Sequence, residues 1–323
     1  MRAIQISTVG GPEVLSPTEL SDPEPGPGEL LVDVAAAGVN FIDVYQRSGT
    51  YAMPLPYVPG LEGAGRVAAL GDDVSGFAVG DRVAWSERLG SYAQRVTVPA
   101  DKAVPVPSSV SDEVAAAVLL QGMTAHFLVN DTYPVRSGDD VLVHAAAGGV
   151  GLLLTQLAVA RGARVIATVS TAEKEELACG AGASDVIRYT EVGDLAAEVR
   201  ALTGGAGVAA AFDSVGRTTF DASLASLRRR GILVLFGGSS GPVPPVDPMR
   251  LNAAGSVFLT RPKLFDHIST RDELTARASA VFTAVAGGTL DVRIGRRYPL
   301  ADARRAHEDL QARRTTGKIL LIP

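Results

Sequence analysis

The chain has 323 residues, of which 46% are hydrophobic and 20% charged, and its net charge at neutral pH is -5. This composition predicts a folded protein of about two domains and excludes a disordered chain. It also provides no general electrostatic reason to bind nucleic acid or an anionic membrane surface.

The single cysteine, Cys179, excludes an internal disulfide and any multi-cysteine zinc or iron–sulfur site. The N-terminal residues lack the apolar segment of a signal peptide, so we expect a reducing, cytoplasmic location. The window Val141–Ala160 contains no Asp, Glu, Lys or Arg, but three glycines interrupt it. We interpret it as a buried strand, a turn and a helix rather than as a membrane span.

The first third of the chain consists of short apolar runs separated by turns rich in Gly and Pro. Many short strands between turn signals predict a barrel-like β module. The predicted strands are Leu30–Ala37, Gly65–Leu70, Asp81–Trp85 and Ala93–Val98.

The middle third alternates apolar strands with helical stretches, which is typical of a doubly wound parallel sheet. The helices are predicted near residues 150–161, from residue 172, and near 195–202 and 219–228. The triplet Arg228-Arg229-Arg230 is predicted at the end of the last helix, where cations suit the helix dipole. The six predicted strands are Val141–Ala145, Arg164–Val169, Val186–Tyr189, Val208–Asp213, Ile232–Phe236 and Val257–Thr260.

The last part of the chain has predicted helices at Arg271–Val285 and Ala301–Arg313 and a closing strand at Lys318–Ile322. It is too short to form a domain alone, so we expect it to complete the first domain. The predicted fold class is α/β, with a β-barrel-type domain (residues 1–124, completed by 263–323) and a doubly wound parallel sheet (residues 125–262).

The most specific motif is VLVHAAAGGVG, which ends at Gly151 and in which a strand turns into a helix. Ala146, Gly148 and Gly151 take the three glycine positions of the dinucleotide fingerprint. Glycine lets the backbone approach a pyrophosphate, and the helix N-terminus offers N–H donors and a positive dipole end. The alternative is a purely structural turn. The predicted cofactor contacts are Ala147, Gly148, Gly149, Val150 and Gly151.

The end of the second predicted strand indicates which dinucleotide to expect. NAD sites carry an acidic residue there for the ribose hydroxyls, whereas this chain has Ser170 and Thr171. Lys174 lies one helical turn beyond Ser170, and hydroxyls with an ammonium group suit a 2′-phosphate. Tyr189, at the end of the third strand, is placed to reach the same face. These residues favour NADPH, and the alternative is that Lys174 and Tyr189 are ordinary surface residues.

Several motifs together resemble the zinc-independent quinone oxidoreductase (ζ-crystallin-like) branch of the medium-chain dehydrogenase/reductase superfamily. The resemblance spans essentially the whole chain, with the motifs in order. It implies a GroES-like catalytic domain interrupted by a Rossmann domain, and a cytoplasmic, homodimeric NADPH-dependent reductase. The motifs are Asn40–Tyr45, Pro59–Gly65, Gly80–Val83, His144–Gly151 with Gln156, Phe212–Gly216, Leu259–Pro262 and Arg305–Glu308.

The resemblance also implies site residues, and among them Tyr51 and Arg261 are the expected donors to a reduced substrate oxygen. The residues implied to face the catalytic cleft are Asn40, Asp43, Tyr45, Tyr51, Glu62 and Arg261. The residues implied to contact the cofactor, besides those already named, are Asn40, Thr124, Ser214, Phe236, Gly237, Gly238, Ser239, Arg261 and Arg313.

We expect no metal. Zinc-containing members of the superfamily carry a ligand cysteine near the position of Asn40 and a Gly-His-Glu triplet where this chain has Gly60-Leu61-Glu62. Neither Asn40 nor Leu61 is a ligand of that kind, and no two of the four histidines have ligand spacing. Hydride transfer from NADPH to a quinone suits such a site, because the acceptor is itself electrophilic.

The sequence leaves two alternative functions open and predicts one oligomeric assembly. The first alternative is NADPH-dependent reduction of an activated C=C bond, in an alkenal or enoyl thioester, which needs the same apolar slot and oxyanion donor. The second is an NADPH-binding structural or RNA-binding protein, although the chain has no basic stripe interleaved with aromatics. The apolar strand Ser256–Thr260, at the end of the strand order, predicts two-fold pairing of sheet edges in a homodimer.

Overall fold

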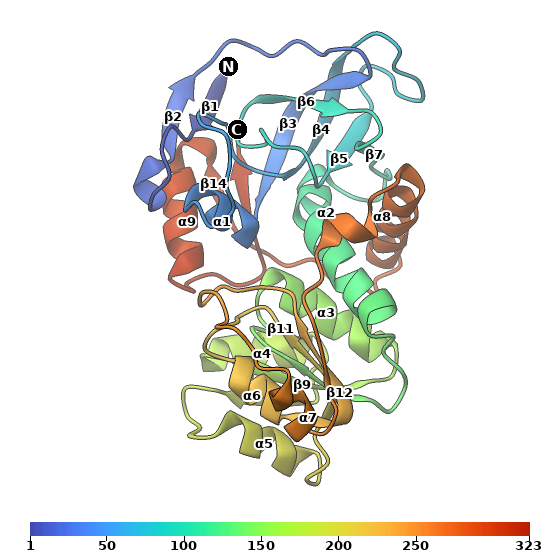
Figure 1. Cartoon of the computed structure of the whole chain (residues 1–323). Coiled ribbons are helices and arrows are strands. Elements are labelled where there is room, and N and C mark those ends of the chain that lie inside the picture. Colours follow the sequence, from blue (N-terminus) through green and yellow to red (C-terminus); the bar gives the residue numbers. More distant parts are fainter. The chain divides into compact units, whose positions relative to one another are not determined.

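The computed structural model describes all 323 residues and divides into two compact units. Unit 1 comprises Met1–Met123 and Ile268–Pro323, and unit 2 comprises Thr124–His267. The chain therefore leaves unit 1 once and returns to it once, which the colour change from green through orange to red follows in Figure 1.

Unit 1 is built on a seven-stranded sheet around the long strand β3 (Glu29–Val39). β3 pairs antiparallel with β4, β6 and β15, so it holds three partners. The one parallel pair joins β14 to β15, both from the returning C-terminal segment. The other strands of this sheet are β4 (Glu62–Leu70), β5 (Arg82–Trp85), β6 (Arg95–Pro99), β7 (Val104–Pro105), β14 (Ile294–Pro299) and β15 (Lys318–Ile322).

The core of unit 1 lies against this sheet. Trp85 is its largest fully buried side chain, and its indole N–H donates to Ser91 Oγ at 2.8 Å. β1 (Arg2–Gln5) and β2 (Ser16–Glu19) form a separate two-stranded sheet. The remaining elements are η1 (Pro12–Val14), α1 (Phe41–Arg47), α8 (Arg271–Ala286), η4 (Leu300–Asp302), α9 (Ala303–Gln311) and α2 (Asp112–Phe127), which begins in unit 1 and ends in unit 2.

Unit 2 contains a six-stranded sheet in which every pair is parallel. Its order is β10-β9-β8-β11-β12-β13, so the direction of strand addition reverses between β8 and β11. In such sheets ligands bind outside the carboxyl ends of the strands at that reversal. The predicted doubly wound sheet is confirmed. Its strands are β8 (Asp140–Val143), β9 (Arg164–Val169), β10 (Asp185–Arg188), β11 (Val208–Asp213), β12 (Leu227–Leu235) and β13 (Phe258–Thr260).

Helices cover both faces of the parallel sheet, and its central strand β11 is buried along its whole length (Figure 1). α3 (Gly149–Ala160) packs against α4 (Ala172–Gly180), and α5 (Leu195–Leu202) packs against α6 (Phe220–Ala225). The apolar window 141–160 is thus a strand, a turn and a helix, and no helix of the chain is long and apolar enough to cross a membrane. The short elements are η2 (Leu128–Thr132, a π-helix), α7 (Met249–Ala253) and η3 (Leu264–His267).

The prediction for the arginine triplet is wrong. The helix expected over 219–228 ends at Ala225, and the three arginines are the exposed beginning of β12. The register between β11 and β12 shifts there, and Arg230 has a φ of +60°. The apolar residues that follow pair with strands on both sides, and this pairing outweighs the helix propensity of arginine.

Candidate active site

The turn from β8 into α3 has the geometry expected of a phosphate-binding loop. Its backbone reverses through Ala145, which has a φ of +51°, and Gly148 N donates to Ala145 O at 2.9 Å. A Cβ on Gly151 would lie only 2.3 Å from Ala145 O, so glycine is required for the helix to begin this close to the strand. No side chain caps α3. Its first-turn N–H groups therefore point outward beside a backbone that an anion can approach.

Ser170 and Lys174 come together at the end of β9. Lys174 Nζ donates to Ser170 Oγ at 3.3 Å, which places the ammonium beside a hydroxyl. Thr171 caps α4, because its Oγ1 accepts the backbone N–H of Lys174 at 3.3 Å. An ammonium, two hydroxyls and a helix N-terminus at one strand end fit the charge of a 2′-phosphate. Tyr189, half-buried, directly follows β10, the neighbouring strand.

The loops after β11 and β12 approach each other closely. A Cβ on Gly237 would lie 2.3 Å from Ser214 O, and Ser239 N donates to Ser214 O at 3.2 Å. Arg261 holds this region from β13's end, because its Nη1 donates to Leu235 O at 2.9 Å and to Gly237 O at 2.7 Å. The predicted segment 236–239, which includes Phe236 and Gly238, thus lies at the carboxyl ends of the parallel strands, as the glycine turn does.

A buried network fixes three of these strand ends. His144 is buried and contacts Thr168 Oγ1 through Nδ1 and Ser223 Oγ through Nε2, both at 2.9 Å. Ser223 donates to Asp213 Oδ2 at 2.7 Å, so the His144 Nε2–H must donate to Ser223. Burial lowers the pKa of His144, which keeps the ring neutral. Its role is structural, as its place at the end of a core strand indicates.

Asn40 lies between β3 and α1 and uses its whole side chain inside unit 1. Its Nδ2 donates to Glu62 Oε2 at 2.8 Å and to Gly38 O at 3.3 Å. Its Oδ1 accepts from Lys318 Nζ at 2.7 Å and from Gln121 Nε2 at 3.1 Å. Asn40 is only 4% exposed, so it acts here as the centre of a polar cluster in the interior of unit 1.

Glu62 and Lys318 form the charged pair of this cluster. Lys318 Nζ lies 2.5 Å from Glu62 Oε2, and both side chains are buried. Glu62 Oε1 also accepts the Leu120 N–H at 2.7 Å. Burial lowers the pKa of Lys318, against the opposing effect of the Glu62 carboxylate. A Cβ on Gly38 would lie 2.5 Å from Glu62 Oε2, so glycine leaves the room that the pair occupies.

Asp43 is fully buried and turned toward the interior of unit 1. Its Oδ2 accepts the Asn40 backbone N–H at 2.8 Å and the Tyr92 hydroxyl at 2.9 Å. Burial raises the pKa of Asp43 to about 7, although these two hydrogen bonds and the Lys318 charge oppose the rise. The Tyr92 hydroxyl also lies 3.1 Å from His307 Nε2.

The tyrosines predicted for the site, Tyr45 on α1 and Tyr51 shortly after it, pack with their rings tilted edge to face. The rings of Tyr45 and Tyr51 lie 5.4 Å apart at 63°, and those of Phe41 and Tyr45 lie 5.5 Å apart at 53°. Tyr51 is 44% exposed, and its backbone N–H donates to Tyr45 O at 3.0 Å. The three rings form an aromatic surface that ends at an accessible tyrosine.

The predicted residues therefore form two groups. One group lies in unit 2. It consists of the residues expected to contact the cofactor, which lie in the loops after the strands of the parallel sheet, and it includes Arg261. The group in unit 1 comprises Asn40, Asp43, Tyr45, Tyr51 and Glu62. Thr124 is the first residue of unit 2, on α2, and Arg313 follows α9 in unit 1 with a φ of +58°.

Sequence analysis missed four residues of the buried cluster in unit 1, namely Tyr92, Gln121, His307 and Lys318. Lys318 carried a signal, because it is the one charged residue in the otherwise apolar strand β15. His307 lies in the family motif Arg305–Glu308, but nothing in the sequence pointed to its contact with Tyr92, which is far away in the chain.

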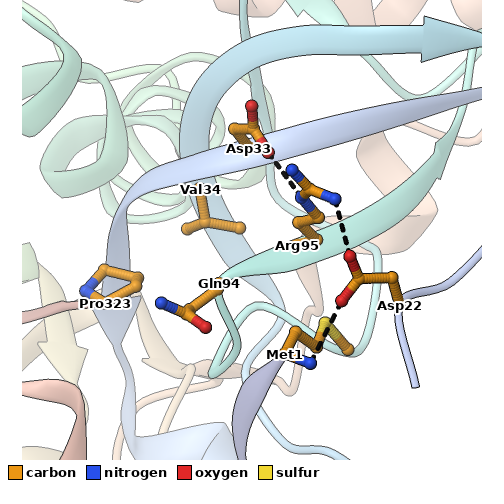
Figure 2. Close-up of a pocket in the computed structure, with 7 residues that line it drawn as sticks. All are labelled: Met1, Asp22, Asp33, Val34, Gln94, Arg95 and Pro323. Atoms are coloured by element: carbon orange, nitrogen blue, oxygen red, sulfur yellow. Dashed lines mark hydrogen bonds and ion pairs between the residues drawn. The ribbon is translucent and has the colours of Figure 1, made fainter. Parts of the chain in front are cut away.

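One cavity of unit 1, of about 370 Å³, involves none of the predicted residues. Figure 2 shows that Arg95 bridges Asp22 and Asp33 on its wall, and that Asp22 also pairs with the Met1 ammonium. Its charges are thus paired with one another. Elsewhere in the chain, no three His, Cys, Asp or Glu side chains gather in a way that could hold a metal ion.

Comparison with known proteins relates both units to one superfamily. Residues 26–108 match the alcohol dehydrogenase GroES-like domain, and residues 149–279 match the domain family described as zinc-binding dehydrogenase. Quinone oxidoreductase of Salmonella typhimurium is 46% identical over 99% of this chain and 99% of its own length. The 2-haloacrylate reductase of a Burkholderia species is 40% identical over 99% of this chain and 98% of its own.

Solved structures agree over the full length. Mycobacterial Rv1454c complexed with NADPH has a TM-score of 0.97 and 53% identity, with all of both chains covered. Escherichia coli quinone oxidoreductase complexed with NADPH has a TM-score of 0.97 and 44% identity, again with complete coverage. The GroES-like and Rossmann fold assignments are therefore confirmed, and the chain belongs to the quinone oxidoreductase branch of the medium-chain dehydrogenase/reductase superfamily.

Proposed function

We propose that this protein is an NADPH:quinone oxidoreductase that works without a metal. The observation that carries the proposal is the Ser170–Lys174 pair at the carboxyl end of β9, in the sheet that also carries the glycine turn. It supplies the positive charge that a 2′-phosphate needs, where an NAD site would have a carboxylate. Similarity over the full length to Salmonella typhimurium quinone oxidoreductase, and to the Escherichia coli quinone oxidoreductase solved with NADPH, supports the same function.

The residues of unit 2 suit each part of the cofactor, from the 2′-phosphate through the pyrophosphate to the nicotinamide half. The α3 N-terminus and the glycine turn would hold the pyrophosphate, and Lys174 with Ser170 the 2′-phosphate. Segment 236–239, fixed by Arg261, would border the nicotinamide half. When bound, NADPH supplies the hydride, so the protein has to orient the acceptor and stabilise the oxygen that becomes negative.

We assign that stabilising role to Tyr51 first. Its side chain is 44% exposed and ends the aromatic surface of α1, which suits a planar acceptor. Arg261 has Nη1 bonded to two backbone carbonyls, which leaves its other guanidinium nitrogens to donate. Asn40, Asp43 and Glu62 act as positioning residues, because their polar atoms bond to one another and to buried neighbours.

Reduction of an activated C=C bond is the second candidate, and the 40% identity to 2-haloacrylate reductase favours it specifically. An acceptor panel separates the two functions. NADPH oxidation is followed with 1,4-benzoquinone, a naphthoquinone, an α,β-unsaturated aldehyde, a 2-haloacrylate and a 2-enoyl thioester. We expect the quinones to turn over fastest. Inert quinones with rapid turnover of an alkene would establish the second function, and NADPH binding without turnover of any acceptor would indicate a non-enzymatic protein.

We further propose a cytoplasmic homodimer joined through β13. This strand ends the order of the parallel sheet, and Phe258 on it is 60% exposed. Pairing of two β13 edges across a two-fold axis would cover that side chain and continue the sheet. The free thiol of Cys179 suits a reducing compartment. Sedimentation should give a dimer mass that Phe258→Lys reduces to a monomer, and a wild-type monomer at all concentrations would refute the assembly.

A further inference from the structure

Two helices of unit 1, α1 and α9, are labelled beside each other in Figure 1, and hydrogen bonds of buried polar side chains link them. Asp43 and Arg47 lie four residues apart on α1, and His307 and Gln311 lie four residues apart on α9, so each pair shares a helix face. Arg47 Nη2 donates to Gln311 Oε1 at 2.9 Å. Tyr92 OH joins Asp43 to His307. Two bridges therefore connect the same two faces.

Several polar atoms in this group have no hydrogen-bond partner in the protein. They comprise donors on Arg47 and Tyr57 and acceptors on Asp43, Gln46 and His307, all on residues less than 10% exposed. Tyr57 is close enough to Asp43 and Arg47, and His307 to Arg47, for their charges to act on one another. The atoms are Asp43 Oδ1, Gln46 Oε1, Arg47 Nε and Nη1, Tyr57 OH and His307 Nδ1.

Because the unsatisfied atoms include both donors and acceptors, they favour one kind of ligand over others. An anion would satisfy Arg47 and Tyr57 but would face the carboxylate oxygen of Asp43 and the ring nitrogen of His307. A cation would satisfy those acceptors but would face the guanidinium. Water both donates and accepts, and buried water commonly bridges polar groups that the protein leaves unsatisfied.

The hydrogen bonds also fix the tautomer of His307. Tyr92 donates its proton to the Asp43 carboxylate, so the Tyr92 oxygen must accept, and His307 must carry its proton on Nε2. Nδ1 is then a bare acceptor, buried and without a hydrogen-bond partner in the protein. Burial and the Arg47 charge lower the pKa of His307 to about 3, which keeps the ring neutral and able to exchange tautomers.

We propose that α1 and α9 enclose a buried water site, and that its water completes a proton relay through His307 and Tyr92 to Asp43. Water gives a proton to His307 Nδ1, Nε2 gives its proton to the Tyr92 oxygen, and the Tyr92 hydroxyl gives its proton to Asp43. Only O–H and N–H bonds form and break. The hydroxide that remains beside Arg47 takes a proton from solvent. Solvent reaches the Arg47 end of the site because Gln311, which accepts a hydrogen bond from Arg47, is exposed.

The relay goes beyond quinone reduction and does not depend on which acceptor the enzyme uses. Its product is the protonated form of Asp43, the carboxyl that accepts the Asn40 backbone N–H. Asp43 has a pKa raised by burial to about 7, so both of its forms are accessible near neutral pH. The charged or titratable groups that act on Asp43 are Glu62 on β4, Lys318 on β15, Tyr57 and Tyr92. Arg47 on α1 interacts in turn with His307 on α9 and with Glu13 on η1.

The water site is tested by a high-resolution crystal structure of the whole chain. We expect ordered water within hydrogen-bonding distance of Arg47 and His307 Nδ1 but not of Asp43 Oδ1, because water in contact with the carboxylate could protonate it directly and bypass the relay. Direct contact between Arg47 and Asp43, a dry interior, or anomalous scattering from a halide would overturn the proposal. In ¹⁵N NMR, His307 should show the Nε2–H tautomer. Tyr92→Phe should remove that preference, whereas Tyr133→Phe, which breaks a similar tyrosine–aspartate bond in unit 2, should not.

The relay is tested by a pH jump from above to below neutrality, with the carboxylic C=O infrared band of Asp43 as the signal. Asp43→Asn identifies the band by its loss. His307→Gln can still donate to Tyr92 and accept from water but cannot pass a proton on. It should slow formation of the band by at least about tenfold. Tyr92→Phe serves as the second interruption if His307→Gln does not fold. An unchanged rate in a folded variant of either kind would overturn the relay.

Discussion

Replacing Lys318 with methionine is the sharpest test of the buried cluster around Asn40. Methionine keeps most of the length of the side chain but removes the charge 2.5 Å from Glu62 Oε2. Removing one member of a buried ion pair costs about 3–5 kcal/mol, because the partner charge stays buried. Glu62 retains two donors, Asn40 Nδ2 and the Leu120 N–H. We therefore expect a loss near the lower limit, about 3 kcal/mol of unfolding free energy.

The chain offers its own probe and control for this measurement. Trp85 is the single tryptophan and is buried in unit 1, so its fluorescence in urea follows the unfolding of that unit. Lys102→Met removes a partly exposed partner of Glu87 in the same unit, and it should cost no more than about 1 kcal/mol.

A double variant decides whether the cost arises from the unpaired charge. Lys318→Met with Glu62→Gln leaves no buried charge at the pair, so it should regain most of the stability that Lys318→Met alone loses. The reasoning is refuted if Lys318→Met costs no more than Lys102→Met, or if the double variant is less stable than the single one.

Three further predictions concern the cofactor, the acceptor and pH. Lys174→Ala should weaken NADPH binding by roughly ten- to a hundredfold, since a charge-assisted hydrogen bond contributes about 1.5–3 kcal/mol, and fluorescence titration should show NADH almost unaffected. Tyr51→Phe should lower turnover with quinones by roughly a hundredfold or more without changing NADPH affinity, whereas Arg261→Ala should weaken both, because Arg261 also holds the backbone after β12. In the native state burial raises the pKa of Asp43 from 3.8 to about 7 and lowers the pKa of His307 from 6.5 to about 3. Between pH 3.8 and pH 6.5 the contribution of Asp43 to the unfolding free energy thus falls as pH rises, while the contribution of His307 increases. Asp43→Asn should therefore have an unfolding free energy that rises more steeply with pH over this interval than that of the wild type, and parallel urea titrations that show equal slopes would contradict this assignment.

The parallel sheet was predictable because each strand is a short apolar run followed by a helix pattern. Arg164–Val169, Leu195–Leu202 and Val208–Asp213 have the predicted bounds. The two strands are buried on both faces, and each of the three segments carries its own local signal. The glycine turn was predictable for the same local reason, since its residues follow one another in the chain.

Several of the unpredicted parts depend on distant contacts. The helix α2 (Asp112–Phe127) and the strand β14 (Ile294–Pro299) were not predicted. β14 carries two exposed arginines, and only its pairing with β15 makes it a strand. The cluster around Asn40 joins residues from β4, α2 and β15, which lie far apart in the sequence. Local patterns identified Asn40 and Glu62 through the family motif, but not the lysine between them.

The central claim is that this chain transfers hydride from NADPH to a quinone without a metal. It is tested most directly by the rate of NADPH oxidation with 1,4-benzoquinone, measured without oxygen after exhaustive chelation and removal of the chelator. We predict that the chelated protein retains the full quinone-dependent rate and that NADH at equal concentration gives a much lower one. A rate that disappears on chelation and returns with zinc, or no quinone-dependent oxidation of NADPH, would contradict the account.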